Sequence, residues 1–326
     1  MIVGGVTILY TFIGGFLAVS YTDVVQGTMM FLALILVPIF GILATGGFGE
    51  MTASAMEFNP DAFSIVSGTT FLGVISLLAW GLGYFGQPHI IIRFMAIKSA
   101  KETKAARRIG FGWVTLSLGG AVLTGLVGSA YFQQNPEITL SNPEAVFLSL
   151  GQILFHPFIA GLMLAAVLAA IMSTVSSQLL VSSSALVEDI YKTVFKKEAS
   201  DKFYVNMGRL AVLFISAIAI YFAWEQNDTI LGLVKFAWAG FGASFGPVIL
   251  MSLYWKKFTS SGALWAMIVG AITVFIWGNT PLKNYLYEIV PGFILALIVG
   301  CVVSKLTYKH NPEVEEIGRA SCRERV

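Results

Sequence analysis

Two stretches of the chain contain residues whose types and spacing could bind a ligand. The first is AWGLGYFGQPHIIIRF at residues 79–94, where Gly81, Gly83 and Gly86 have the spacing of a dinucleotide-binding turn. That turn needs a strand before the first glycine and an acidic residue about 20 residues further on. Here the preceding FLGVISLLAW is an apolar segment of helical length, and residues 105–108 are Ala-Ala-Arg-Arg. The glycines therefore do not indicate a nucleotide site.

The same glycines, together with Pro88, predict an interrupted membrane helix. Pro88 has no N–H for the carbonyl of Tyr84, and three glycines with one proline disfavour a helix by about 6 kcal/mol on soluble scales. Transporters use broken helices to present helix ends and free carbonyls to a substrate. Trp80, Tyr84 and Pro88 are spaced i, i+4, i+8 and share one helix face. This face either packs against a neighbouring helix or lines a binding site.

The second stretch is VLAAIMSTVSSQLLVSSSALVEDIYK at residues 167–192, an apolar helix with hydroxyl side chains along it. Such hydroxyls commonly bond backbone carbonyls and permit close packing in membrane bundles. Alternatively, Ser173 and Thr174 with a nearby carbonyl offer neutral oxygens, which suit a hard cation such as sodium. The sequence pattern does not separate these two interpretations.

The elements that must hold these residues are membrane helices. The chain has 326 residues, of which 56% are hydrophobic and 12% charged, whereas a soluble domain has about 25% charged residues. Its cysteines, Cys301 and Cys322, form neither a disulfide framework nor a CxxC metal pair. Apolar segments of about 20 residues recur and predict an all-α polytopic membrane protein with about nine spans. We place these spans at residues 2–18, 25–46, 69–95, 110–133, 157–182, 207–224, 230–254, 261–279 and 286–307.

The cationic residues predict the orientation of these spans. With alternating spans, most of them fall on one side, which the positive-inside rule identifies as cytoplasmic, so the N-terminus is expected outside. The cations on that side are Arg93, Lys98, Lys101, Lys104, Arg107, Arg108, Lys192, Lys196, Lys197, Lys202, Lys256, Lys257, Lys305 and Lys309. Lys283 is the exception, and Lys235 lies inside an apolar span, where it either snorkels to the interface or faces the bundle. The net charge of +2 is spread over short loops and indicates no nucleic-acid partner.

Four stretches resemble the sodium:solute symporter family, and the resemblance extends along nearly all of residues 1–315. They are YTFIGGFLAVSYTDVVQ, WGLGYFGQPHIIIRFMA, AAIMSTVSSQLLVSSSALVEDIYK and AWAGFGASFGPVIL. Within the second, GYFGQPH is similar to the proline branch of the family. The resemblance implies a leucine-transporter-like inverted-repeat fold in the bacterial inner (plasma) membrane and sodium-driven symport of L-proline. Sodium, L-proline and membrane lipid are the expected partners, and no obligate protein partner is evident.

The resemblance also implies site residues and repeat boundaries. Trp80, Tyr84 and Pro88 match positions of the family's proline site. Ala170, through its carbonyl, and Ser173 and Thr174 match its sodium-coordinating positions. Asp23 matches an acidic residue associated with sodium dependence and is a weaker candidate, because it could instead cap a helix starting at Val24. Residues 1–46 would end the first repeat, 69–254 would form the second with its broken helix near 80–88, 261–307 would be two peripheral helices, and 308–326 a cytoplasmic tail.

The resemblance begins at the fifth helix of a protein with about thirteen spans. We therefore expect an incomplete first repeat and a chain that is inactive alone. Residues 316–326, EIGRASCRERV, resemble an in-frame translation of a sequencing adapter. The alternatives are a sodium symporter for another small organic solute, an intramembrane enzyme, or a channel. The sequence has three histidines and no HExxH, and neither a charged ring nor a repeated filter loop stands out, so we expect no enzyme.

Overall fold

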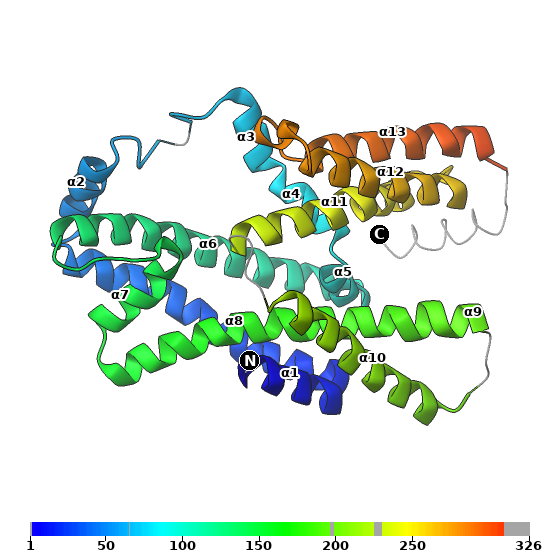
Figure 1. Ribbon diagram of the computed structural model, residues 1–326, viewed down its shortest axis with the longest axis horizontal. Coiled ribbons are helices and arrows are strands. Elements are labelled where there is room, and N and C mark those ends of the chain that lie inside the picture. Colours follow the sequence, from blue (N-terminus) through cyan, green and yellow to red (C-terminus); the bar gives the residue numbers. More distant parts are fainter. Residues whose placement is uncertain (1, 65, 196–198, 225–229, 310–326) are drawn as a thin grey trace. The chain divides into compact units, whose positions relative to one another are not determined.

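The computed structural model describes residues 2–64, 66–195, 199–224 and 230–309. The tail expected beyond residue 309, including the adapter-like residues 316–326, lies outside this range. Within it, the secondary structure is helical, with no strand (Figure 1). Seven helices are long and apolar enough to cross a membrane, and an eighth span results if the bent pair Phe71–Gly86 and Pro88–Met95 counts as one. The all-α polytopic class is confirmed, although the described spans are fewer than the nine expected.

The helices form two compact units. The first unit comprises Met1–Ile65 and Ala105–Trp224, and the second comprises Val66–Lys104 and Glu225–Val326. The elements assigned to the first unit are α1 (Ile2–Ala44), α2 (Phe48–Phe58), α6 (Thr103–Gln134), η2 (Pro143–Ala145), α7 (Val146–Leu154), α8 (Pro157–Ser184), η3 (Ala185–Lys192), α9 (Thr193–Phe195) and α10 (Asp201–Phe222). The elements of the second unit are α3 (Phe71–Leu78), α4 (Trp80–Gly83), η1 (Tyr84–Gly86), α5 (Pro88–Met95), α11 (Ile230–Tyr254), α12 (Ser260–Gly278), η4 (Pro281–Asn284) and α13 (Ile289–Thr307).

Helix α1 differs from the prediction of two spans separated near residues 19–24. It runs for 43 residues, and its backbone leaves the helical region only at Gly15, with φ 55° and ψ −155°. This conformation is essentially restricted to glycine, because a Cβ clashes with the backbone there. The polar residues at 19–24 do not end the helix; Thr22 Oγ1 donates to the carbonyl of Val19 at 2.9 Å. Asp23 therefore lies inside α1, and the interpretation of Asp23 as an N-cap was wrong.

Helices α1 and α8 pack against each other in the first unit. Two hydrogen bonds tie neighbouring helices to α1: the phenol of Tyr10 donates to the carbonyl of Met172 at 3.2 Å, and Trp113 Nε1 donates to the carbonyl of Gly27 at 3.1 Å. Beyond α8 the chain continues as the π-helix η3 and then α9, so the span predicted at 157–182 extends to Phe195. The fully buried side chains of this unit's core include Val37, Met51, Val127 and Leu150.

Helices α11, α12 and α13 pack against one another in the second unit. Helix α12 begins where Thr259 Oγ1 accepts a hydrogen bond from the backbone N–H of Gly262 at 3.1 Å, which satisfies one of the N–H groups left free at a helix start. Small side chains at the buried positions let these helices approach closely. The core around α11 includes Ala239, Ala243, Val274 and Ile289.

Candidate functional site

The helix of residues 71–95 is interrupted within the predicted stretch. Its two halves, Phe71–Gly86 and Pro88–Met95, are bent by 50°. Gln87 has an extended backbone with φ −82° and ψ 111°, and the turn before it, Tyr84–Gly86, is 3₁₀. Pro88 occupies the first turn of α5, where its missing N–H costs nothing because no helical acceptor faces that position.

Gly83 and Gly86 permit close packing against α11, whereas the sequence predicted that they weaken the helix. Gly83 keeps a helical backbone, with φ −63° and ψ −32°, so it does not break the helix. A Cβ added to Gly83 would overlap the indole of Trp238, and one added to Gly86 would overlap the carbonyl of Phe241. Gly83 and Gly86 therefore allow the interrupted helix to lie close against α11 (Figure 1). A Cβ at Gly81, in contrast, would meet open space.

Trp238 of α11 holds the interrupted helix from both sides of its break. Trp238 Nε1 donates to the carbonyl of Trp80 at 2.9 Å, and the carbonyl of Trp238 accepts from Gln87 Nε2 at 3.2 Å. The Trp238 ring also stacks on Trp80, with centroids 5.2 Å apart, and meets Tyr84 edge to face at 4.8 Å. Gln87 is 3% exposed. The structure thus brings Trp80 and Tyr84 together on Trp238, while Pro88 lies beyond the bend.

Of the two aromatic candidates, Tyr84 is the more accessible. It is 45% exposed, whereas the Trp80 ring lies between Trp238 and Tyr287, the latter at a centroid distance of 6.4 Å. Packing against a neighbouring helix, one of the two roles considered for this face, is therefore present at both residues. Such packing also fixes the ring orientations, which a binding site for a small solute requires.

The predicted cation ligands gather on one turn of α8 in the first unit. Ser173 Oγ donates to the carbonyl of Ala170 at 3.0 Å, and Thr174 Oγ1 donates to the same carbonyl at 3.2 Å. Thr174 is exposed, and the other two residues are half-buried. Three neutral oxygens thus lie together, as a sodium site requires, but the same hydrogen bonds also suit simple helix packing. Asp23 is half-buried on α1, the helix that packs along α8.

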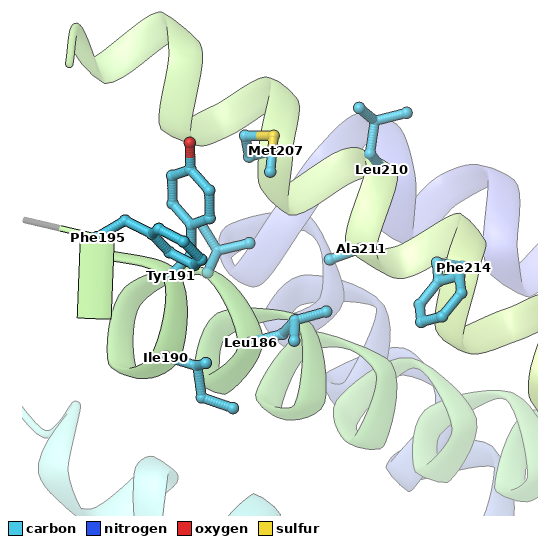
Figure 2. Close-up of a pocket in the computed structure, with 9 residues that line it drawn as sticks. Leu186, Ile190, Tyr191, Phe195, Met207, Leu210, Ala211 and Phe214 are labelled. Atoms are coloured by element: carbon cyan, nitrogen blue, oxygen red, sulfur yellow. The ribbon is translucent and has the colours of Figure 1, made fainter. Parts of the chain in front are cut away.

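An apolar groove of the first unit suits neither a cation nor a zwitterion. It has a volume of about 340 Å³ and lies between η3 and α10. Figure 2 shows Leu186, Ile190 and Phe195 on one side and Met207, Leu210 and Phe214 on the other. Tyr191 supplies the one polar side chain in this lining. Burying an unpaired charge there would be costly.

Sequence inspection missed Trp238 and Gln87 as parts of this site. A signal was present: AWAGFGASFG, which contains Trp238, repeats the alternation of aromatic residues and glycines in WGLGYFG. Two such segments can interlock, because each glycine leaves space for a bulky group or for the backbone of the other helix. Gln87 offered no comparable signal, since its burial depends on the bend.

The described residues form apolar helices, and one of the spans, residues 71–95, is interrupted, as is common in membrane transporters. The chain belongs to the sodium:solute symporter family, whose sequence profile matches residues 1–270. It is 61% identical over 306 residues to the high-affinity proline transporter PutP of Bacillus subtilis, covering 94% of this chain and 64% of that protein. It is 53% identical over 304 residues to the osmoregulated proline transporter OpuE of the same organism, covering 93% of this chain and 62% of that protein. The chain thus spans less than two thirds of the length of either relative.

A solved structure shares the fold. A sodium-coupled sialic acid symporter, in a substrate-bound outward-open state, superimposes with a TM-score of 0.73 and 22% sequence identity. The match covers 95% of this chain and 66% of that structure. At this identity the similarity concerns the fold, and it confirms the transporter-like helical architecture expected from the resemblance.

Proposed function

We propose that this chain forms part of a symporter that couples L-proline uptake to sodium entry by alternating access. The observation that carries the proposal is the 61% identity over 306 residues to a proline transporter. The chain would reside in a bacterial plasma membrane, with its N-terminus outside and its C-terminus in the cytoplasm. Its role would be transport and not catalysis.

The substrate would contact the accessible side of the interrupted helix. Tyr84 and Trp80 offer aromatic surface to the apolar pyrrolidine ring, and Pro88 marks the start of α5, whose N-terminal dipole favours a carboxylate. Trp238 and Gln87 would hold these groups in place, because the Trp238 indole donates to the Trp80 carbonyl and Gln87 Nε2 donates to the Trp238 carbonyl.

Sodium would be a transported ion held by α8. The carbonyl of Ala170 and the hydroxyls of Ser173 and Thr174 would supply neutral oxygens once the hydroxyl hydrogens turn away from that carbonyl. Asp23 stays a weaker candidate, supported by its position on α1. Each sodium ion moved inward gains about 2.3 kcal/mol per 100 mV of membrane potential, which can drive proline uptake.

The test uses a chimera, in which the aligned 306 residues of this chain replace the matching part of the Bacillus subtilis transporter. Cells or vesicles with this chimera should take up labelled L-proline saturably, and only when a sodium gradient is present. A chimera that reaches the membrane but takes up no proline, or takes it up equally without sodium, would contradict the proposal. The chain expressed alone should be inactive, which a parallel assay tests.

A symporter for another small solute is the second candidate. The fold match to a sialic acid symporter shows that this architecture serves more than one substrate, but that protein shares only 22% identity with this chain. Competition by unlabelled sugars, sialic acid and amino acids in the same uptake assay distinguishes the two candidates, because only L-proline should compete strongly.

A further inference from the structure

Lys235 and Lys283 both line one cavity of the second unit. The predicted orientation of the chain explains the position of neither lysine. Lys235 interrupts an otherwise apolar span, and Lys283 is the exception to the distribution of cations on one side. The cavity has a volume of about 700 Å³ and is formed by residues 69–80, the start of α11 and residues 283–287. Both lysines are exposed and belong to its lining.

One wall of this cavity is fixed by Tyr287. Its backbone N–H donates to Ser76 Oγ at 3.0 Å, and its phenol donates to the carbonyl of Lys235 at 2.7 Å. The Lys235 ammonium lies 4.9 Å from the centre of the Tyr287 ring, a cation–π contact. These contacts hold the cation at a defined place.

The side chains that line the cavity include two cations and are otherwise largely apolar. Its lining contains the two lysines and the hydroxyls of Thr69, Thr70 and Ser76, and among these described lining residues there is no carboxylate. Leucine side chains supply the apolar surface, among them Leu72, Leu77 and Leu231. A ligand with a negative head and a hydrocarbon body complements this arrangement, because each part then meets its preferred surroundings.

We propose that this cavity binds an anionic membrane phospholipid, with its phosphate between Lys235 and Lys283 and an acyl chain along the leucines. Phospholipids are the anionic amphiphiles that surround a membrane protein in the greatest number, and lysine ammonium groups form charge-assisted hydrogen bonds with phosphates. The lysine stems can lie along apolar surface while the ammonium groups meet the headgroup. Trp80, a proposed substrate contact, also borders this cavity, but the test below measures lipid binding and not transport, so its outcome does not depend on the proposed function.

The experiment measures lipid retention by the purified chain. The chain is prepared in detergent with phosphatidylcholine, phosphatidylglycerol is titrated in, and native mass spectrometry counts the bound lipids. Lys235→Gln and Lys283→Gln should each weaken phosphatidylglycerol binding about fivefold. Lys235→Arg and Lys283→Arg should retain it, because the charge remains. Lys256→Gln is the matched control: an exposed lysine of the same unit that does not line the cavity and whose loss should change nothing.

Each result decides the proposal. Equal retention of phosphatidylglycerol and phosphatidylcholine, or unchanged binding in both Gln variants, overturns it. Inorganic phosphate is added in a separate arm. If phosphate at low millimolar concentration displaces phosphatidylglycerol completely, the site recognises a free anion as well as the lipid headgroup, and the proposal of a lipid site is overturned. A melting curve by circular dichroism accompanies each variant, and the Arg variants provide the comparison if a Gln variant does not fold.

Discussion

The indole of Trp238 donates a hydrogen bond to the carbonyl of Trp80, while the carbonyl of Trp238 accepts one from Gln87. A single residue of α11 thus contacts the interrupted helix before and after the 3₁₀ turn Tyr84–Gly86. Trp80 opens α4, before that turn, and Gln87 follows the turn. The two hydrogen bonds of Trp238 therefore tie both ends of the turn to α11 and stabilise the bent conformation.

Replacing Trp238 by Phe removes the donor and keeps an aromatic ring for stacking. We expect a rise of roughly twofold to tenfold in the proline concentration that half-saturates uptake by the chimera, since a hydrogen bond is worth about 0.5–1.5 kcal/mol. The maximal rate should change less, because Trp238 would act by positioning Trp80 and Tyr84. Trp265→Phe is the control, since Trp265 is 50% exposed on α12. Equal effects of both substitutions would argue against a specific role of Trp238.

Gly86 and Gly81 offer a matched pair within the same stretch. A Cβ at Gly86 would overlap the backbone of Phe241, which cannot move aside as a side chain can, whereas Gly81 faces open space. Gly86→Ala should therefore lower the free energy of unfolding by about 1–3 kcal/mol. Gly81→Ala should leave it unchanged or raise it by up to about 1 kcal/mol through better helix propensity. Thermal unfolding in detergent compares them; a Gly86→Ala protein as stable as the parent would refute the close contact.

Removing the hydroxyls of α8 tests the proposed sodium ligands. The double variant Ser173→Ala, Thr174→Ala should raise the sodium concentration for half-maximal uptake by about tenfold or more, since contacts to a charged group are worth about 1.5–3 kcal/mol. Proline saturation at high sodium should be largely retained. Ser183→Ala is the control on the same helix, because Ser183 Oγ donates to the carbonyl of Leu180 at 3.0 Å in the same manner. Sodium dependence identical to the parent's would remove these residues from the site.

The break in α1 requires glycine at one position. Gly15 has φ 55° and ψ −155°, a region that costs other residues about 1–3 kcal/mol. Gly15→Ala should lower stability by that amount or straighten the helix, while Gly5→Ala, at a position with open space in the same helix, should not. Thermal unfolding combined with the circular dichroism signal separates the two outcomes for Gly15. A variant with unchanged stability and helix content would contradict the observed backbone.

The sequence allowed the prediction of apolar helices and of one interruption, because both depend on local composition. The position of the interruption within residues 79–94 follows from Pro88, whose chemistry acts on its own neighbours. The roles of Gly83 and Gly86 could not be predicted in the same way, because they depend on α11, more than 150 residues further along the chain. Local patterns also misplaced the break in α1: the polar residues near Asp23 stay helical, and Gly15 alone deviates.

The candidate site was predicted in its residue types and not in its contacts. The hydroxyls of α8 were identified because they are unusual in an apolar helix, and both of them meet at the Ala170 carbonyl. Trp80 and Tyr84 were identified from their spacing, but their common partner Trp238 comes from a helix that no periodicity connects to them. Lys235 and Lys283 likewise could not be connected from the sequence, because the cavity that both of them line is formed by segments far apart in the chain.

The π-helix η3 affects which changes in length the end of α8 tolerates during evolution. A π-helix closes its hydrogen bonds one residue later than an α-helix does, so it accommodates additional residues without unwinding. The side chains from Thr193 onward therefore point in other directions than a continuous α-helix of 3.6 residues per turn from α8 would give them. Residues 185–192 are accordingly the part of this helix where an insertion or deletion could be absorbed by rewinding alone.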